Sequence, residues 1–413
     1  MTSGSAALPL AGWRRFLIVA GPGLVVMLAD TDAGSVITAA QSGAQWGYRL
    51  LLMQFLLIPI LYIVQELTVR LGLVTGKGHA ELIAQHFGRY WAWFSVATLI
   101  VSCVGALLSE LSGIAGVGSL MGVPVPVTLA LVVTALLIMA FTHSYLTVER
   151  IAIVVGGFEL VFLLVAWLAH PSVGEIASGS LSIPLSDPKY LYLASANIGA
   201  VIMPWMVFFQ QSSIVEKKLT TRDLAPARLD TAVGAVLTQL IMAAVLVAVA
   251  ATLGKAGGDR ALDTVQEISE AITPFLGKIG GDVLFALGMS GAALVATIVV
   301  TLTAARTLAE VLGVNHGLHH EPAEAPWFYG VYAVALVVGA VVVGSGVNLV
   351  ALSVGVQVMN AVLLPIVLTF LFLLALRLPD PFRLKGAYAW IAGALIAVTT
   401  LFGVYAGIAG LWG

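Results

Sequence analysis

Four carboxylate side chains lie well inside apolar stretches of this sequence: Asp30, Asp32, Glu110 and Glu159. In a membrane-spanning stretch an ionisable side chain is costly, and it is retained where it is paired or functional. A carboxylate in such a place attracts a cation or holds a proton. Glu110 and Glu159 could instead bond to neighbouring polar groups, whereas the residues around Asp30 and Asp32 point to a binding role.

Asp30 and Asp32 belong to a polar patch, Ala-Asp-Thr-Asp-Ala-Gly-Ser at 29–35, in the middle of the first apolar run. A glycine beside several side chains that can bond their own backbone makes a poor helix interior. Non-helical backbone at membrane depth is tolerated only where it is buried in protein or lines a cavity. The patch therefore predicts a broken helix with a carboxylate at the break, where a cation would bind.

A second interruption lies at 199–205, Gly-Ala-Val-Ile-Met-Pro-Trp. Pro204 lacks a backbone N–H and so frees the carbonyl of Ala200, four residues earlier. A free carbonyl, the thioether of Met203 and a carboxylate from another helix would together form a metal shell. A single Met-Pro is usually a packing kink, but its pairing with the acidic break favours a functional role.

The composition indicates what kind of protein holds these two breaks. Of 413 residues, 60% are hydrophobic and 10% are charged, whereas soluble domains carry about 25% charged residues. This composition excludes a soluble globular protein, a disordered chain and a nucleic-acid-binding protein. The single cysteine, Cys103, excludes a disulfide framework and a cysteine-rich metal site. The sequence predicts an all-α polytopic membrane protein.

Apolar runs long enough to cross a bilayer, about 20 residues each, predict eleven spans. They lie near 16–42, 50–73, 92–121, 126–146, 150–170, 192–213, 229–253, 282–306, 328–348, 350–376 and 388–411. The connectors are short, so residues 1–413 are expected to form one transmembrane domain, and no cleaved signal peptide is expected.

The two breaks occupy corresponding positions, in the first and sixth spans. This arrangement predicts a first five-helix repeat at 16–170, a second at 192–376 and an eleventh helix at 388–411. Interrupted helices at matching positions of two halves are typical of secondary transporters with inverted repeats, which bind their substrate near the membrane midplane.

The distribution of basic residues predicts the orientation, because Lys and Arg concentrate in cytoplasmic loops. With the N-terminus inside, 14 of the 19 basic residues fall on the cytoplasmic side. We therefore expect a multi-pass protein of the cell membrane with a cytoplasmic N-terminus and the C-terminus outside.

Other charged groups are expected to be ordinary. Glu66 should pair with Arg70, four residues further along one helix face, and the charged run at 216–218 should be a solvated loop. Three histidines of the loop after the eighth span should be solvated rather than bind a metal: His316, His319 and His320.

Three segments resemble the natural-resistance-associated macrophage protein family of divalent metal transporters. Residues 32–35 and 41–48 look like the family's first-span Asp-Pro-Gly-Asn stretch and the residues just after it. Residues 70–77, with 80–82 just beyond, are similar to its second-span exit, and 199–204 to its sixth-span motif. The likeness is weaker in the third, eighth and tenth spans.

The resemblance implies a leucine-transporter-type fold, with two inverted five-helix repeats plus an eleventh helix. It also implies a transported divalent metal ion, the lipid bilayer as the surroundings, and no cofactor, nucleic acid or obligate protein partner. The family's metal ligands map to Asp32, Ser35, the Ala200 carbonyl and Met203, with Gln357 in the tenth span as a possible further ligand.

The chain departs from the family where protons are handled. Trp205 replaces the histidine after Met-Pro, and Leu107 replaces a carboxylate three residues before the matching Glu110. Proton coupling is therefore expected to be weak or absent, with Asp30, Glu110 and Glu159 as the remaining candidate proton acceptors. Ser35 also replaces an asparagine and Ala33 a proline.

The donor types bear on which metal is carried. A thioether at Met203 favours ions softer than magnesium, such as manganese or iron, while the short Ser35 leaves room for the waters that magnesium keeps. We expect a manganese- or iron-like ion, with a magnesium transporter of a related branch as the alternative.

Other classes remain as rivals. An organic-cation or amino-acid transporter of the same fold could use the Trp205 ring as a cation–π face. A channel also remains open. An enzyme is not expected, because the sequence contains neither a His-Glu-x-x-His nor a Gly-x-Ser-x-Gly motif.

Overall fold

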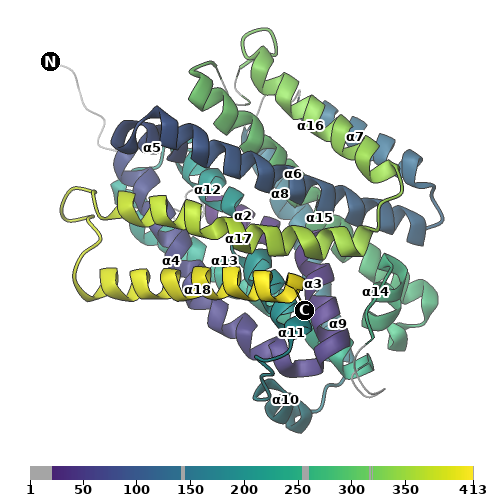
Figure 1. The fold of residues 1–413 in the computed structure, drawn as a ribbon. Coiled ribbons are helices and arrows are strands. Elements are labelled where there is room, and N and C mark those ends of the chain that lie inside the picture. The colour runs from purple at the N-terminus through teal and green to yellow at the C-terminus, as the bar shows by residue number, and fades with distance from the viewer. Residues whose placement is uncertain (1–20, 141–144, 254–259, 316–317, 319, 413) are drawn as a thin grey trace, which may run out of the picture.

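The computed structural model describes residues 21–140, 145–253, 260–315, 318 and 320–412. The regular elements of these residues are all helices, and the longer ones run roughly along one axis (Figure 1). The elements that make up the predicted spans are α2 (Pro22–Asp30), α3 (Ala33–Trp46), α4 (Leu51–Thr75), α6 (Arg89–Leu120), α7 (Val125–Ala140), α8 (Tyr145–Gly156), α9 (Val161–Leu168), α11 (Pro188–Val201), α12 (Pro204–Glu216), α13 (Leu224–Leu253), α15 (Lys278–Leu312), α16 (Pro326–Gly344), α17 (Leu349–Ala375) and α18 (Gly386–Trp412).

Short elements connect them. They are η1 (Gly47–Leu50), α5 (His79–Phe87), η2 (Gly157–Leu160), α10 (Val173–Ser180), η3 (Thr221–Asp223), α14 (Val265–Ile272) and η5 (Pro274–Leu276). The sequence did not predict α5, α10 and α14, because each has only eight or nine residues, lies between the long apolar runs and gives too short a periodic signal of its own.

Each of the eleven predicted spans overlaps one long helix or one interrupted pair of helices. Among the described residues, nine helical runs are long and apolar enough to cross a membrane. That number treats Ala33–Thr75 as one run, although η1 divides it into α3 and α4, and it omits the 16-residue α7. The start of the first predicted span lies outside the described residues.

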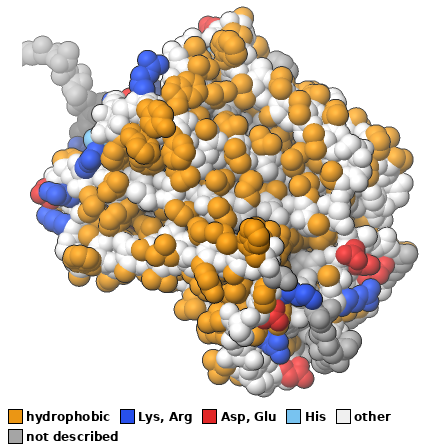
Figure 2. Space-filling model, in the orientation of Figure 1, with side chains coloured by type: hydrophobic (Ala, Val, Ile, Leu, Met, Phe, Trp, Pro, Cys, Tyr) orange, Lys and Arg blue, Asp and Glu red, His pale blue; other side chains and the backbone are white. Residues whose placement is uncertain are grey.

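Large apolar side chains cover the outside of the helix bundle. Figure 2 shows a broad hydrophobic face, with most charged side chains at the left edge and at the lower right. Leu131 on α7, Val341 on α16 and Leu401 on α18 are each at least 65% exposed. An apolar surface of this extent, with charges confined to the two ends, fits a lipid-facing belt.

The interrupted pair α11–α12 forms the centre of the bundle. In the most apolar 18-residue stretch of this pair, 94% of the residues are buried inside the protein. The first half, α11, packs against α17 and α18, which lie side by side (Figure 1). The second half, α12, packs against α4, α2 and α15. The second break is therefore held inside protein on all sides, as non-helical backbone at this depth requires.

Glycines allow the helices around the two breaks to approach closely. A Cβ added to Gly199 on α11 would lie 1.8 Å from the backbone oxygen of Gln357 on α17. A Cβ on Gly34 would lie 2.2 Å from the Gln357 side-chain nitrogen and 2.6 Å from the hydroxyl of Ser109. At Gly199 only glycine fits, because the nearest atoms belong to the backbone of α17, whereas at Gly34 two side chains would have to move. Both contacts show that α17 lies directly against both breaks.

Ion pairs hold the helices together at one end of the molecule. Glu66 pairs with Arg70 at 2.8 Å, which confirms that prediction, and also with Arg228 on α13 at 2.6 Å. The expectation of a solvated loop at 216–218 holds for Lys218, which is exposed, but was wrong for the other two residues. Lys217 pairs with Glu149 on α8 at 2.7 Å, and Glu216 pairs with Arg306 on α15. The spacing in the sequence predicted the Glu66–Arg70 pair, which lies on one helix. It gave no sign of the ion pairs that join helices far apart in the sequence.

The predicted histidine cluster is only partly described. His316 and His319 lie outside the described residues. His320 lies 3.4 Å from a carboxylate oxygen of Glu324, four residues further along the loop. The solvated character of the whole cluster therefore stays a prediction.

Gly199→Ala should destabilise the protein, because the new methyl group would overlap the backbone of α17, and overpacking usually costs about 1–3 kcal/mol. Gly330→Ala is the matched control, since nothing lies within 4 Å of a Cβ at that helical position. We expect the first variant to lose several degrees of thermal midpoint in detergent, or to fail to fold, and the second to be unchanged or slightly more stable. Equal midpoints would contradict the close contact.

A candidate cation site between two helix breaks

The first predicted break is present. Helix α2 ends at Asp30 and α3 begins at Ala33. Asp32 is extended (φ −74°, ψ 172°) and caps α3, with its Oδ1 accepting a hydrogen bond of 2.6 Å from the backbone N–H of Ser35. Its other oxygen, Oδ2, is buried and has no hydrogen-bond donor among the described residues. The break thus leaves one carboxylate oxygen available to a ligand.

The second break lies directly opposite the first. Helix α11 ends at Val201, and α12 begins at Pro204 after two extended residues. The carbonyl of Ala200, which Pro204 cannot bond, accepts a hydrogen bond of 2.9 Å from the Ser35 hydroxyl. This contact joins the two breaks through two of the predicted ligands.

Gln357 reaches the first break from α17. Its Nε2 lies 3.4 Å from Asp32 Oδ1, and its Oε1 accepts a hydrogen bond of 3.0 Å from the Asn360 side chain. Asn360 in turn accepts one of 2.7 Å from the Ser102 hydroxyl on α6. This network turns the amide nitrogen toward Asp32, so the amide must rotate before its oxygen can bind a cation.

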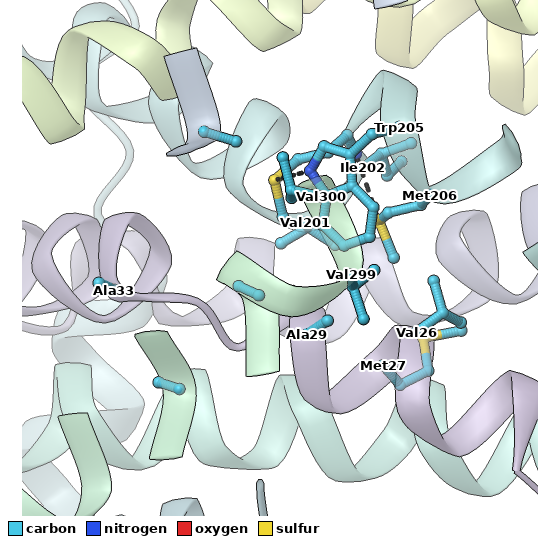
Figure 3. Close-up of a cluster of buried hydrophobic side chains, with 14 of the residues drawn as sticks. Val26, Met27, Ala29, Ala33, Val201, Ile202, Trp205, Met206, Val299 and Val300 are labelled. Carbon is cyan, nitrogen blue, oxygen red and sulfur yellow. Dashed lines mark hydrogen bonds between the residues drawn. The ribbon is translucent and has the colours of Figure 1, made fainter. Parts of the chain in front are cut away.

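The Met203 sulfur is held by Trp205. The indole N–H donates a hydrogen bond of 3.2 Å to Met203 Sδ, and the Met203 backbone N–H lies 3.4 Å from Met206 Sδ. Both Met203 and Trp205 are fully buried. Figure 3 shows the indole nitrogen turned to one sulfur, with the ring among apolar residues of three helices: Val26, Met27, Ala29, Val201, Val299 and Val300.

Glu110 on α6 supports the start of α3. Its Oε2 accepts a hydrogen bond of 3.0 Å from the backbone N–H of Ala33, and its carboxyl lies beside that of Asp32. A carboxylate at a helix N-terminus is stabilised by the unpaired N–H groups and the helix dipole. Glu110 therefore holds the first residue of α3 in place at the edge of the predicted metal shell.

Asp30 and Glu159 do not join the predicted shell. Asp30 Oδ2 lies 3.4 Å from the hydroxyl of Thr238 on α13, which is 2.6 Å from the Thr31 hydroxyl. Glu159, in η2, is fully buried and lies near Thr31. These four residues form a second polar cluster, called the α2-end cluster below.

The five predicted ligands are at most 1% exposed. Hydrogen bonds join four of them, Asp32, Ser35, Ala200 and Gln357. Met203 lies in the second break, three residues after Ala200, and its sulfur accepts the Trp205 N–H. Asp32 and Ser35 lie on the first interrupted helix, Ala200 and Met203 on the second, and Gln357 on α17. No described group of three or more His, Cys, Asp and Glu could hold a metal, so a cation here would have one carboxylate and otherwise neutral donors.

Sequence reasoning missed three polar partners: Ser102, Asn360 and Thr238. Asn360 follows Gln357 by three residues in an apolar span, so it lies on the same helix face. That spacing is a signal that could have identified it. Thr238 gave none, because a threonine in a span usually bonds its own helix.

Comparison with known proteins places the chain in a family. A model of the natural resistance-associated macrophage protein-like family matches residues 23–409. The chain belongs to this family. The divalent metal cation transporter MntH of Bradyrhizobium diazoefficiens is 29% identical over 316 residues, covering 72% of this chain and 69% of the relative. MntH of Ralstonia nicotianae is 30% identical over 311 residues, covering 70% and 68%.

Solved structures share the fold. A manganese transporter of Eremococcus coleocola matches 100% of this chain and 90% of its own, with a TM-score of 0.75 and 18% identity. MhsT in complex with L-phenylalanine matches 94% of this chain and 98% of its own, with a TM-score of 0.63 and 15% identity. The predicted leucine-transporter-type fold is confirmed, and the family member is a transporter rather than an enzyme.

Trp205→Phe should strengthen binding of a thiophilic ion such as cadmium, because it keeps the ring but removes the N–H that occupies the Met203 sulfur. A neutral hydrogen bond contributes about 1 kcal/mol, so we expect cadmium affinity to rise roughly fivefold. Titration calorimetry of purified protein measures it. In a Met203→Ala background the same substitution should have no effect. No change in the parent background would mean that the sulfur does not meet the ion.

Proposed function

We propose that this protein is a secondary transporter that moves divalent metal cations across the cell membrane by alternating access. The observation that carries the proposal is the buried Asp32 carboxylate at the meeting point of two helix breaks. The Ser35 hydroxyl bonds the Ala200 carbonyl beside it, and we assign the thioether of Met203, three residues further along the second break, to the same shell. A cation there would meet one negative charge and several dipoles in a place sealed from water.

The relatives support the same substrate class. Curated proteins that are 29–30% identical to this chain carry the name divalent metal cation transporter, and a protein of the same fold is a manganese transporter. The donor set around Asp32 supports this substrate class independently of those names.

The interrupted helices support alternating access. We assign the first five-helix repeat to 16–170, the second to 192–376 and the eleventh helix to 388–411, with one break in each repeat. Relative movement of two such halves would expose the breaks first to one side and then to the other. We assign the ion-paired end of the bundle to the cytoplasm, since it holds basic loops, with the C-terminus outside.

The donor set favours a manganese- or iron-like ion, because Met203 supplies a soft ligand beside hard oxygens. A magnesium transporter is the second candidate, and one contact favours it: the Trp205 N–H already engages the Met203 sulfur at 3.2 Å. With the sulfur held there, mainly oxygen donors would face the ion. The packing of the Trp205 ring among apolar side chains does not support a cation–π site for an organic substrate.

Proton coupling is proposed to be weak or absent. Trp205 and Leu107 replace two groups that would carry protons in the family's pathway. His79, outside the spans, is buried, and burial lowers its pKa to about 4, although a contact with Gln211 of 3.0 Å opposes this. Its imidazole therefore stays uncharged near neutral pH and offers no proton exchange there.

Asp32→Asn tests the charge alone, because asparagine caps a helix about as well as aspartate. We expect manganese binding to weaken at least about 100-fold, since a charged ligand is lost from a dehydrated site, while the thermal midpoint without metal stays close to the parent value. Asp187→Asn is the matched control: Asp187 caps α11 through Lys189 N–H at an exposed position. Parent-like metal binding by Asp32→Asn would refute the proposed site.

Proton movement is measured with a pH dye inside proteoliposomes while manganese enters down its gradient. The expected result is metal uptake with far less than one proton per ion. A metal-dependent acidification that disappears in Glu110→Gln would show that coupling survives through Glu110 and would overturn this part of the proposal.

A further inference from the structure

The α2-end cluster brings oxygen atoms from three helical segments to one buried point. Asp30 and Thr31 end α2, Thr238 lies on α13, and Glu159 lies in η2. The two threonine hydroxyls are 2.6 Å apart, and Thr238 lies 3.4 Å from Asp30 Oδ2. All four residues are at most 2% exposed. None of them belongs to the predicted metal shell.

The cluster contains buried oxygens that lack a donor. Asp30 Oδ1 and both carboxylate oxygens of Glu159 have no hydrogen-bond partner among the described residues. No described lysine, arginine or histidine forms an ion pair with either carboxylate. A buried charge without a partner is strongly unfavourable, so the two carboxylates either hold protons or bind a cation.

The end of α2 adds to this attraction. The last carbonyls of a helix lack intrahelical donors and carry the negative end of its dipole. Here the closing bond from Thr31 N–H to the Met27 carbonyl is long, at 3.4 Å. Ends of interrupted helices and their unwound carbonyls are places where transporters of this architecture bind small cations.

The donor types select the kind of cation. Every donor is an oxygen, and the hydroxyls are neutral, so the set does not suit a soft transition metal. Magnesium needs a strict octahedron and usually keeps several waters. No three described acidic, His or Cys residues cluster closely enough to hold a metal ion, and two carboxylates beside two short neutral hydroxyls suit a small hard cation of the kind that couples transport in this architecture.

We propose that the α2-end cluster binds a sodium ion, held by the Asp30 and Glu159 carboxylates and the hydroxyls of Thr31 and Thr238. Sodium here and a divalent ion at Asp32 would together supply three positive charges to the four carboxylates around the first break. The fourth, Glu110, is stabilised by the N-terminus of α3, where it accepts the Ala33 N–H.

Sodium binding would have a consequence for transport, and this part rests on the proposed function. The sodium ion would fix Asp30 two residues from Asp32 and so hold the break in the shape that receives the divalent ion. Metal uptake would then follow the sodium gradient, which gives a driving ion to a carrier that lacks the family's proton-handling residues.

Binding is tested first on the purified full-length protein, by thermal midpoint at constant ionic strength in sodium, potassium or choline chloride. We expect sodium to raise the midpoint by several degrees, with smaller or no effects of potassium and choline. Thr238→Val and Glu159→Gln should each remove the sodium effect, and Thr238→Ser should restore it. Thr68→Val is the control, since Thr68 is equally buried but bonds only the Val64 carbonyl of its own helix.

Transport is tested in proteoliposomes at clamped pH, as manganese uptake with an inward sodium or choline gradient. We expect sodium to speed uptake several-fold in the parent and in Thr68→Val, but not in Thr238→Val, which should still bind manganese. If neither the rate of manganese uptake nor the thermal midpoint changes with sodium, the sodium site is refuted, while the proposed function as a metal transporter stands. Absence of manganese uptake in every buffer would refute the proposed function. The change of the thermal midpoint in sodium would still show whether the sodium site exists.

Discussion

The hydrogen bond from the Ser35 hydroxyl to the Ala200 carbonyl is the contact on which the centre of this molecule depends. Each helix break frees backbone groups at a depth where water cannot satisfy them. Asp32 and Glu110 accept the first N–H groups of α3, and Ser35 satisfies the carbonyl that Pro204 leaves open. The breaks are stable because a side chain of the first satisfies a backbone group of the second. The helices around them must therefore pack closely enough to bring the two breaks together.

Charge is distributed very differently at the centre and at the end of the bundle. At one end Glu66 contacts two arginines and Lys217 pairs with Glu149, so the charges there are neutralised within the protein. Around the first break the carboxylates have no such partners among the described residues. The first arrangement stabilises the fold. The second is costly unless the carboxylates hold protons or bind positive ligands, which explains why it is better understood as a functional feature than a structural one.

The sequence predicted the features that depend on neighbours along the chain. Both breaks were visible because glycine, proline and polar residues interrupt apolar runs, and the Glu66–Arg70 pair because its spacing matches a helix turn. The indole contact with Met203, the orientation of the Gln357 amide and the separation of Asp30 from the predicted shell were not visible. These depend on side-chain rotamers between helices that are far apart in the sequence, which no local pattern encodes.

The contacts within the proposed shell bear on how such a site could release its ion. A cation that takes the Ser35 and Ala200 oxygens as ligands must replace the hydrogen bond between them, and one that takes Met203 must compete with the Trp205 N–H. Gln357 must turn its amide away from Asn360. Each of these exchanges costs about 1 kcal/mol, so the protein's own contacts compete with coordination at most of the proposed ligand positions. Binding then rests mainly on Asp32, and an ion held chiefly by one carboxylate can leave again when the breaks open. A transporter requires this balance, since a site that bound its ion through uncontested ligands alone would retain it.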